Sequence, residues 1–599
     1  MPAANWSYAS RLEALRETKM RHTREKQELI GAMNHDDWAI VLPPEEYREV
    51  VQTISGSGMP ITDVRIKGFE PESNHPNGGF FGPKACGANF RKLLEAHPPY
   101  ADPNSSLLGA YCVNFGSYRK AGWKPEFDFS HLHAEQGKYQ LGTGIGAQQH
   151  FCQDLSIGLD LGWGGLLEKI QHYRGVNGPE HADFYTGLED VAVGMQAWIR
   201  TNVDHARELA VAEPSADIRH SLRDMADMNE RLITDAPATF REACQWIGWF
   251  DMAARMYNGS GSLGRLDVLL EPYYEREHPA GTLSDEEAIF HIACCLVMDT
   301  GYLQLGGPRA DGSDATSRVS YLVLEAAHRL RIPANVAVCV GESTDPALLR
   351  RGVEVMIEDN TGVPKFLGMD NFAEGFAKNG YPIELARERA YSGCHWCAIP
   401  GREYTLNDCV KINLGAIFQV AWGDLFADDT EPDVDQLWRL FDHHLRRAVE
   451  VLAEGLDFHM AHMHEVFPEL VMDLLCHGTI EKGLDASNGG VEYVNLCVDG
   501  AALATVADSF GALQQRIEVE GKLTWDDING HIEANWQEAD GERVRLLMKN
   551  TPRFGSGDSL GDGYALRITR LFTEVISEKP TPGGFNMIPG FFSWANTIP

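Results

Sequence analysis

Apolar residues recur every three or four positions on a charged background through much of the first half of the chain. Residues 189–213, EDVAVGMQAWIRTNVDHARELAVAE, have this spacing, which is typical of an amphipathic helix. Residues 215–250 predict two further helices, and Pro237 suits the opening of the second because the first turn leaves its N–H groups unpaired anyway. The pattern predicts a mainly helical segment over residues 1–330.

The pattern changes after residue 331, where short apolar, β-branched runs alternate with helical spacing. IPANVAVCVGE (332–342) and GVPKFLG (362–368) predict strands. DPALLRRGVEVMIED (345–359) and YPIELARERAYSG (381–393) predict the helices that follow them. This alternation indicates an α/β architecture with parallel strands. A glycine-rich loop such as SNGGVEYVNLCVDG (487–500) is then expected at a strand end, where α/β proteins place their sites.

No repeat or linker interrupts the 599 residues, so we expect one domain over residues 1–599. The formal net charge of −34 would repel phosphate, which disfavours nucleic acid and anionic membranes as partners. No apolar run reaches the length of a membrane span, and the first residues lack a signal-peptide core. The twelve cysteines are not spaced as in a secreted disulfide scaffold. These features favour the cytoplasm.

Candidate chemistry begins with Cys394 and Cys397, which form C-x-x-C in a loop. A redox dithiol needs its first cysteine at a helix amino terminus, whereas here a helix is expected before Cys394 and AIPGREY interrupts the chain after it. A structural zinc site needs a second pair at matched spacing, and none is present. By spacing alone, two unrelated thiols remain the simplest interpretation.

The histidines of DFHMAHMHEVFPEL, which are His459, His462 and His464, do not form H-E-x-x-H because Pro468 occupies the second histidine position. They are interpreted as ordinary polar residues of a helix, and no metal site is expected. The sequence also lacks a Walker loop, a dinucleotide-binding glycine motif after a strand and a nucleophile elbow.

Eight segments occur in one order along most of the chain. They are DAPATFREACQ (235–245), GSLGRLDVLLEPYYE (261–275), GGPRADGSDATSRVSYLVLEA (306–326), PIELARERAYSGC (382–394), GLDASNGGVEYVN (483–495), VADSFGAL (506–513), TPRFGSGDSLGDGYA (551–565) and PTPGGFNMIPGFFS (580–593). In this order they resemble the glycyl radical enzymes, the pyruvate formate-lyase-like family.

The resemblance implies a ten-stranded α/β barrel, built from two five-stranded parallel halves and surrounded by helices, with residues 331–599 as the half that carries the thiyl loop. It implies that Cys394 is the thiyl residue and Cys397 a bystander. A radical S-adenosylmethionine activating enzyme would install the glycyl radical, and a homodimer is the family precedent. Trp396 and Ile399 make an apolar neighbourhood, which keeps a buried thiol protonated.

The loop departs from the family pattern at its acid–base group. Many eliminating members carry Gly-Cys-Val-Glu, whereas this chain places Trp396 at the glutamate position, and an indole cannot transfer that proton. Asp408 matches an aspartate that holds the substrate hydroxyl in the dehydratases. His395 and Glu403 are the candidate replacements, with solvated loop positions as the alternative.

His150 lies near the expected position of the family histidine, about one helical turn away from it. The family glycine lies in a sequence like Arg-Val-x-Gly-Tyr, and the printed chain stops at GFFSWANTIP before that segment. GDGYALR (561–567) is expected on a helix instead. The hypothesis is therefore a split enzyme whose glycine loop is a separate subunit, with a truncated product as the rival.

The sequence thus predicts the thiyl-radical subunit of an anaerobic lyase that cleaves or rearranges a C–C or C–heteroatom bond in a small substrate. Trp396 in place of a carboxylate favours an aromatic or apolar substrate. Three alternatives stay open. They are a dehydratase with a replacement acid–base group, a synthase that adds a hydrocarbon to fumarate through Arg402, and a non-catalytic scaffold.

Overall fold

The structure is a computed structural model, and it describes residues 6–30, 41–54, 60–147, 151–393, 396–406, 409–427 and 431–592. The chain divides into two compact units, which it enters alternately. Unit 1 comprises Met1–Glu126, Gln148–Thr405 and His462–Tyr493, and unit 2 comprises Phe127–Ala147, Leu406–Ala461 and Val494–Pro599. The single domain expected over residues 1–599 stays a prediction.

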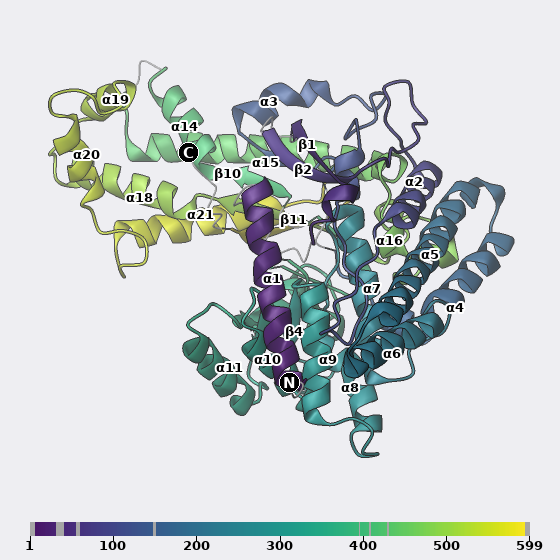
Figure 1. Cartoon of the computed structure of the whole chain (residues 1–599). Coiled ribbons are helices and arrows are strands. Elements are labelled where there is room, and N and C mark those ends of the chain that lie inside the picture. Colours follow the sequence, from purple (N-terminus) through teal and green to yellow (C-terminus); the bar gives the residue numbers. More distant parts are fainter. Residues whose placement is uncertain are drawn as a thin grey trace. The chain divides into compact units, whose positions relative to one another are not determined.

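Unit 1 is mainly helical, as the spacing of its apolar residues predicts (Figure 1). Its helices are α1 (Tyr8–Ile30), α2 (Pro83–Ala96), α4 (Leu155–Val176), α5 (Ala182–Ala212), α6 (Ala216–Leu232), α7 (Phe240–Asn258), α8 (Leu266–Glu277), α9 (Asp285–Met298), α10 (Arg318–Leu330), α11 (Pro346–Asp359), α12 (Asp370–Lys378), α13 (Ile383–Arg387), α16 (Leu470–Asp473) and α17 (Thr479–Lys482). Its strands are β1 (Arg48–Ile54), β2 (Pro60–Ile66), β4 (Leu303–Leu305), β5 (Val336–Val340), β6 (Lys365–Gly368), β7 (Ala390–Tyr391), β8 (Cys397–Ala398) and β9 (Glu403–Thr405).

The predicted alternation of strand and helix after residue 331 is confirmed in unit 1. Strands β4, β5 and β6 form a parallel sheet in that order, and α11 makes the crossover between β5 and β6. Residues 336–339 of β5 are fully buried, as expected for a parallel strand that is covered on both faces.

Two predicted helix boundaries in unit 1 are wrong. Helix α7 begins at Phe240 and not at Pro237, because Thr239 caps it and exchanges hydrogen bonds with Glu242 in a capping box. The helix predicted over residues 381–393 ends at Arg387, and strand β7 begins at Ala390. A strand and not a helix therefore precedes Cys394.

Unit 2 contains a sheet with the order β12-β11-β10-β3, in which the first three strands are parallel and β3 is antiparallel. The strands are β3 (Gly142–Thr143), β10 (Val410–Asn413), β11 (Tyr493–Ala501, which begins in unit 1) and β12 (Met587–Phe591). The helices are α3 (His133–Lys138), α14 (Leu414–Leu425), α15 (Val434–Val466, which ends in unit 1), α18 (Leu503–Leu513), a π-helix (Gln514–Val519), α19 (Trp525–Glu533), α20 (Gly541–Lys549) and α21 (Leu560–Ser577).

Two expectations about this part of the chain can be compared with the structure. Residues 561–567, GDGYALR, lie within α21 as predicted. The loop expected over residues 487–500 is shorter than predicted, because β11 already begins at Tyr493. Within the described part of the chain, no helix combines the length and apolar character that crossing a membrane requires.

A buried carboxylate at the start of α8 connects this helix to the turn after β4 and to the start of α10. Asp267 accepts hydrogen bonds from the Gly306 N–H at 2.8 Å and from the Ser320 hydroxyl at 2.5 Å. Burial raises the pKa of Asp267, and these hydrogen bonds oppose the rise. The Gly-Arg-x-Asp segment (264–267) therefore holds the glycine-rich turn at residues 306–307 against the start of α10.

We expect Asp267→Asn to lower the free energy of unfolding by about 1–3 kcal/mol, because an amide NH₂ cannot accept both hydrogen bonds and leaves a buried donor unpaired. The midpoint of urea unfolding measures this loss. Asp204→Asn, on an exposed face of α5, is the control and should stay within about 0.5 kcal/mol. An equal loss in both variants would contradict the role of Asp267.

Candidate active site

The residues on either side of Cys394 form a β-hairpin. Strands β7 and β8 are antiparallel, with Tyr391 opposite Cys397, and the Ser392 N–H donates to the Trp396 carbonyl at 3.1 Å. Cys394 and His395 lie outside the described residues, and together with Gly393 they connect these two paired positions in the sequence. No helix occurs among residues 396–406, so the described residues after Cys394 differ from those of a redox dithiol.

A fully buried ion pair joins the base of this hairpin to β9. The Arg389 guanidinium donates to the two Glu403 carboxylate oxygens at 2.8 and 2.9 Å, and both side chains are 0% exposed. Arg389 also donates to the Cys397 carbonyl at 3.3 Å. Because the bidentate geometry is directional, it sets where β7 begins relative to β9.

Each partner of the ion pair has further contacts within unit 1. The Glu403 carboxylate accepts from the Ile399 N–H at 2.9 Å and from the Tyr381 hydroxyl at 2.8 Å. The Arg389 guanidinium carbon lies 3.2 Å from the centre of the Phe376 ring and 4.5 Å from that of Tyr381. The two charges are thus compensated by hydrogen bonds and by aromatic faces, which a buried pair requires.

Strand β7 of the hairpin is hydrogen-bonded to side chains of the parallel sheet of unit 1. The Tyr391 N–H donates to the Gln304 side-chain oxygen at 2.8 Å, and Gln304 belongs to β4. Lys365 of β6 donates to the Tyr391 hydroxyl at 3.1 Å and to the Asn335 side chain at 2.8 Å. These contacts place the hairpin beside strands β4 to β6.

The turn that follows the hairpin requires a glycine. Gly401 has φ +64°, and a Cβ atom there would lie 2.8 Å from both the Asp154 side chain and the Leu475 carbonyl. Its N–H donates to the Cys152 carbonyl at 2.8 Å. Since Cys152 also packs against Ala390 and Ala398, the segment that begins two residues after His150 lies against the hairpin.

Buried, largely apolar side chains surround the second strand of the hairpin. Trp396 and Ile399 are 4% and 2% exposed, and Cys397 packs with Tyr302, Ala337 and Tyr391. Burial raises the pKa of the Cys397 thiol to about 12, with smaller contributions from Arg389 and Glu403. A thiol in these surroundings keeps its hydrogen at neutral pH.

The structure describes some of the predicted site residues and leaves others undescribed. Cys394, His395, Asp408 and His150 lie outside the described residues, so their roles stay predictions. Trp396 is buried beside the hairpin, as its apolar character suggests.

Glu403 and Arg402 are adjacent in the sequence, but the Glu403 side chain is buried and the Arg402 side chain is partly exposed. Glu403 is buried in its ion pair with Arg389. The alternative that it occupies a solvated loop position is therefore wrong. Arg402 pairs with Glu492 at 3.2 Å, and both side chains are more than two-fifths exposed.

Sequence reasoning missed Arg389, Tyr381 and Gln304. Arg389 stands in the quoted segment RERAYSGC, but an arginine after a helix reads as a solvated residue until its distant carboxylate partner is known. The one signal that could have indicated a buried arginine is the buried strand directly after Arg389. A helix was predicted at those residues instead, so the signal was not used.

The three histidines near the end of α15 lie on a helix, as predicted. His459 is fully buried, however, and its Nδ1 accepts from the Gly146 N–H at 3.1 Å. Burial lowers the pKa of His459 to about 3, so the ring is neutral. No group of three His, Cys, Asp or Glu side chains suited to a metal ion occurs among the residues described.

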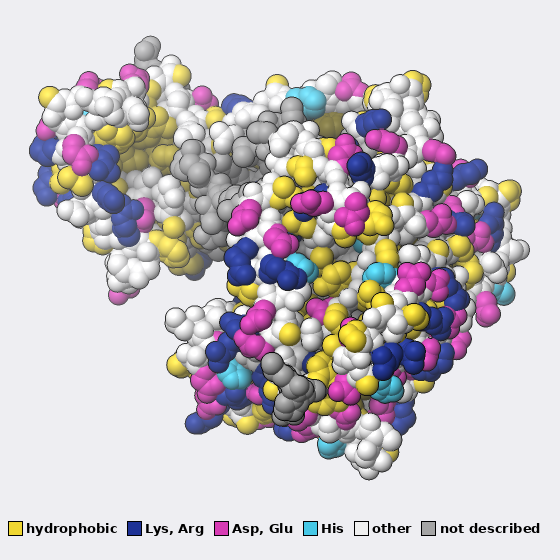
Figure 2. Space-filling view, viewed as in Figure 1, with side chains coloured by type: hydrophobic (Ala, Val, Ile, Leu, Met, Phe, Trp, Pro, Cys, Tyr) yellow, Lys and Arg dark blue, Asp and Glu magenta, His cyan; other side chains and the backbone are white. Residues whose placement is uncertain are grey.

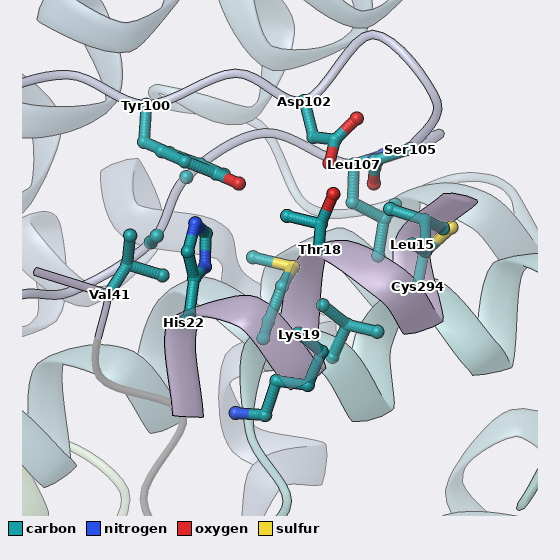
Figure 3. Close-up of a pocket in the computed structure, with 14 residues that line it drawn as sticks. Leu15, Thr18, Lys19, His22, Val41, Tyr100, Asp102, Ser105, Leu107 and Cys294 are labelled. Carbon is teal, nitrogen blue, oxygen red and sulfur yellow. Dashed lines mark hydrogen bonds between the residues drawn. The ribbon is translucent and has the colours of Figure 1, made fainter. Parts of the chain in front are cut away.

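A cavity beneath α1 is too small for a substrate. Figure 3 shows His22 and Thr18 of α1 facing Tyr100 and Asp102 across it. Its volume is about 30 Å³, which suits one or two waters. Burial lowers the pKa of His22 to about 4, so this polar pocket carries a neutral imidazole.

We expect Glu403→Gln to destabilise unit 1 by about 3–5 kcal/mol, because it leaves the Arg389 charge buried without a counter-charge. Urea unfolding measures the loss. Glu492→Gln removes the exposed partner of Arg402 and should cost less than about 1 kcal/mol. Combining Glu403→Gln with Arg389→Met should recover part of the loss, and a strictly additive double variant would contradict the pairing.

The Cys397 thiol should resist iodoacetamide at pH 8 in the folded protein and react once urea unfolds it. Its folded pKa lies above the unfolded value of 9.0, so the stability that the neutral thiol contributes is present below pH 9 and is lost as pH rises towards 12. Peptide mapping after alkylation reports the labelled fraction. Rapid labelling of folded protein would refute the burial.

The chain is similar to known proteins in sequence and in fold. A family model described as "Pyruvate formate lyase-like" matches residues 135–599. The chain is 22% identical to (2S)-3-sulfopropanediol dehydratase of Klebsiella oxytoca, with 74% of this chain and 59% of the relative covered. It is 24% identical to the 4-hydroxyphenylacetate decarboxylase glycyl radical subunit of Clostridioides difficile, with 74% and 58% covered.

A solved structure shows the same fold. The glycerol-bound form of the B12-independent glycerol dehydratase from Clostridium butyricum superposes with a TM-score of 0.75 at 19% identity, with 85% of this chain and 75% of that chain covered. The predicted fold class, an α/β barrel of the glycyl radical enzyme type, is confirmed. The chain spans less than two thirds of the length of these curated relatives.

Proposed function

The chain belongs to the pyruvate formate-lyase-like family, and from this premise we propose that it is the thiyl-bearing catalytic part of a glycyl radical lyase. Cys394 is the proposed thiyl residue. The substrate is a small molecule in which a C–C or C–heteroatom bond is cleaved or rearranged. The supporting observation is the β7–β8 hairpin, whose connecting residues include Cys394 and whose base is held by the buried pair of Arg389 and Glu403.

The surroundings of the hairpin suit hydrogen-atom transfer better than thiolate chemistry. A thiolate nucleophile needs a nearby positive charge or a helix amino terminus. Arg389, the cation that acts on the neighbouring Cys397 thiol, is already neutralised by Glu403, and burial raises the pKa of that thiol to about 12. A neutral S–H group retains the hydrogen atom that a radical exchanges, and exclusion of water protects radicals from side reactions.

A radical S-adenosylmethionine activating enzyme is proposed to install the glycyl radical on the family's glycine loop, and the Cys394 thiol gives its hydrogen atom to that radical. This chain would contribute the sulfur that then takes hydrogen from the substrate and returns it to the product. No metal is part of the proposal. A homodimer of the catalytic part completes it.

The substrate class remains a proposal that rests on Trp396. A buried indole at the position of the usual glutamate favours an aromatic or apolar substrate, and a decarboxylation or other C–C cleavage over simple loss of water. The similarity to the 4-hydroxyphenylacetate decarboxylase subunit is consistent with that direction.

A dehydratase is the second candidate, because several similar relatives are dehydratases by name. Glu403 is poorly suited as its acid–base group, since both carboxylate oxygens already accept two hydrogen bonds each. That role would fall to His395, Asp408 or His150. A fumarate-adding synthase would need Arg402, which is engaged by Glu492 at the surface, and a scaffold would need none of these residues.

We place the protein in the cytoplasm as part of the proposal. Each of the eleven cysteines that the structure describes is a free thiol, which fits a reducing compartment.

Cys394→Ser should abolish turnover, with a loss of at least about 10⁴-fold, because a hydroxyl does not replace the thiol in hydrogen-atom exchange. The assay follows substrate loss without oxygen, with the activating enzyme and the glycine-loop polypeptide present. Cys397→Ser is the matched control and should keep activity within about tenfold. An equal loss in the two variants would favour a dithiol, and unchanged activity in Cys394→Ser would overturn the proposal.

A further inference from the structure

A large open groove lies at the carboxyl ends of the parallel strands of unit 2. Its walls come from residues directly after β10, β11 and β12, together with α14, α18 and α19. Its volume is about 930 Å³, and a second hollow of about 370 Å³ continues it towards α20. Six aromatic or aliphatic side chains dominate the walls, namely Phe418, Trp422, Ile532, Phe554, Phe591 and Phe592.

Exposed apolar side chains are concentrated in one part of unit 2, residues 519–566. The structure describes eleven large hydrophobic residues that are substantially exposed, and six of them lie between Val519 and Leu566. Ile532 and Phe554, which line the groove, are 43% and 47% exposed. Figure 2 shows hydrophobic side chains gathered on the lobe that Figure 1 labels α18 to α21, with Lys and Arg beside them. Such a concentration marks a protein interaction surface.

Basic side chains slightly outnumber acidic ones at the rim of the groove. Arg545, Lys549 and Arg553 line the hollow next to α20, and Asp508 is the single acidic residue among the described lining positions. Asp508 pairs with Arg553 at 2.9 Å, and Arg545 pairs with Glu542 of α20 at 2.8 Å. Lys549 has no ion-pair partner within the described part of the chain. At the opposite end, Lys411 lies 5.2 Å from the centre of the Phe592 ring.

A basic rim is unusual in a chain whose formal net charge is −34. Long-range repulsion would keep acidic partners away from most of this surface, whereas the rim attracts them locally. A small organic anion would fill the hollow but would leave the apolar residues outside it uncovered. A helical segment with one apolar face and one acidic face covers both kinds of surface.

We propose that this groove docks an acidic, amphipathic helical segment of a partner protein. The apolar face of the segment lies on Phe418, Trp422 and Ile532, and its carboxylates face Arg545 and Lys549. The proposal does not depend on the proposed function, because docking requires no turnover.

The test measures fluorescence anisotropy of two labelled 18-residue helical peptides added to the full chain. Both carry the same leucine face, and the polar face is glutamate in one peptide and lysine in the other. The glutamate peptide should bind saturably and at least tenfold tighter, and its affinity should fall with added salt. Equal affinities, or no saturable binding by the glutamate peptide, would overturn the proposal.

Charge-reversal variants test whether the glutamate peptide binds at this groove. Arg545→Glu with Lys549→Glu should weaken the glutamate peptide at least tenfold. Arg223→Glu with Lys378→Glu, at exposed positions of α6 and α12, makes the same charge change elsewhere and should have no effect. Ile532→Ser should also weaken binding, and because Ile532 is exposed the fold should remain, as circular dichroism can verify. Equal loss in both charge-reversal pairs would contradict docking at this groove.

Other occupants give different results. If the chain self-associates in sedimentation and the Arg545→Glu and Lys549→Glu changes alone dissociate it, the groove holds a second copy and the proposal fails. If anilinonaphthalene sulfonate binds there while neither peptide does, the groove holds a small anion and the proposal fails as well. A partner cross-linked through benzoylphenylalanine at position 532 supports the proposal only if the linked segment is amphipathic and acidic.

Discussion

The buried ion pair between Arg389 and Glu403 holds the β7–β8 hairpin against β9. Two opposite charges without water are stable only at close range and with their remaining hydrogen-bonding groups engaged. Here the carboxylate accepts four hydrogen bonds, and the guanidinium carbon lies over the Phe376 and Tyr381 rings. Any shift of the hairpin would separate the charges, so the pair makes displacement of the loop energetically costly.

This arrangement also changes the role that Glu403 can have. A carboxylate nine residues after the proposed thiyl cysteine is a natural candidate for proton transfer when only the sequence is considered. In the structure its oxygens are occupied, and its charge is required by Arg389. The residue thus serves to position the hairpin, while the apolar side chains Trp396 and Ile399 exclude water from the same neighbourhood. Positioning and dryness are both properties that radical chemistry needs from its protein.

The packing explains why two short segments contain a glycine and an aspartate. The glycine of Pro400-Gly401 is required because a side chain there would collide with Asp154 and the Leu475 carbonyl. The aspartate of the 264–267 segment holds the turn at Gly306 and the start of α10. These residues are far from one another in the sequence, and each one closes a contact between two segments. Their order along the chain therefore carried the resemblance, although no single segment was distinctive.

The sequence by itself determined the helical character of the first half, the strand–helix alternation after residue 331 and the family to which the chain is similar. These properties depend on local periodicity and on the order of short segments, both of which are visible along the chain. Only the tertiary structure decided that β7 and β8 pair as antiparallel strands, that Arg389 and Glu403 are partners, and that an apolar groove with a basic rim remains open in unit 2. Those features depend on which distant residues meet and how much water they lose, and neither quantity is encoded in local spacing.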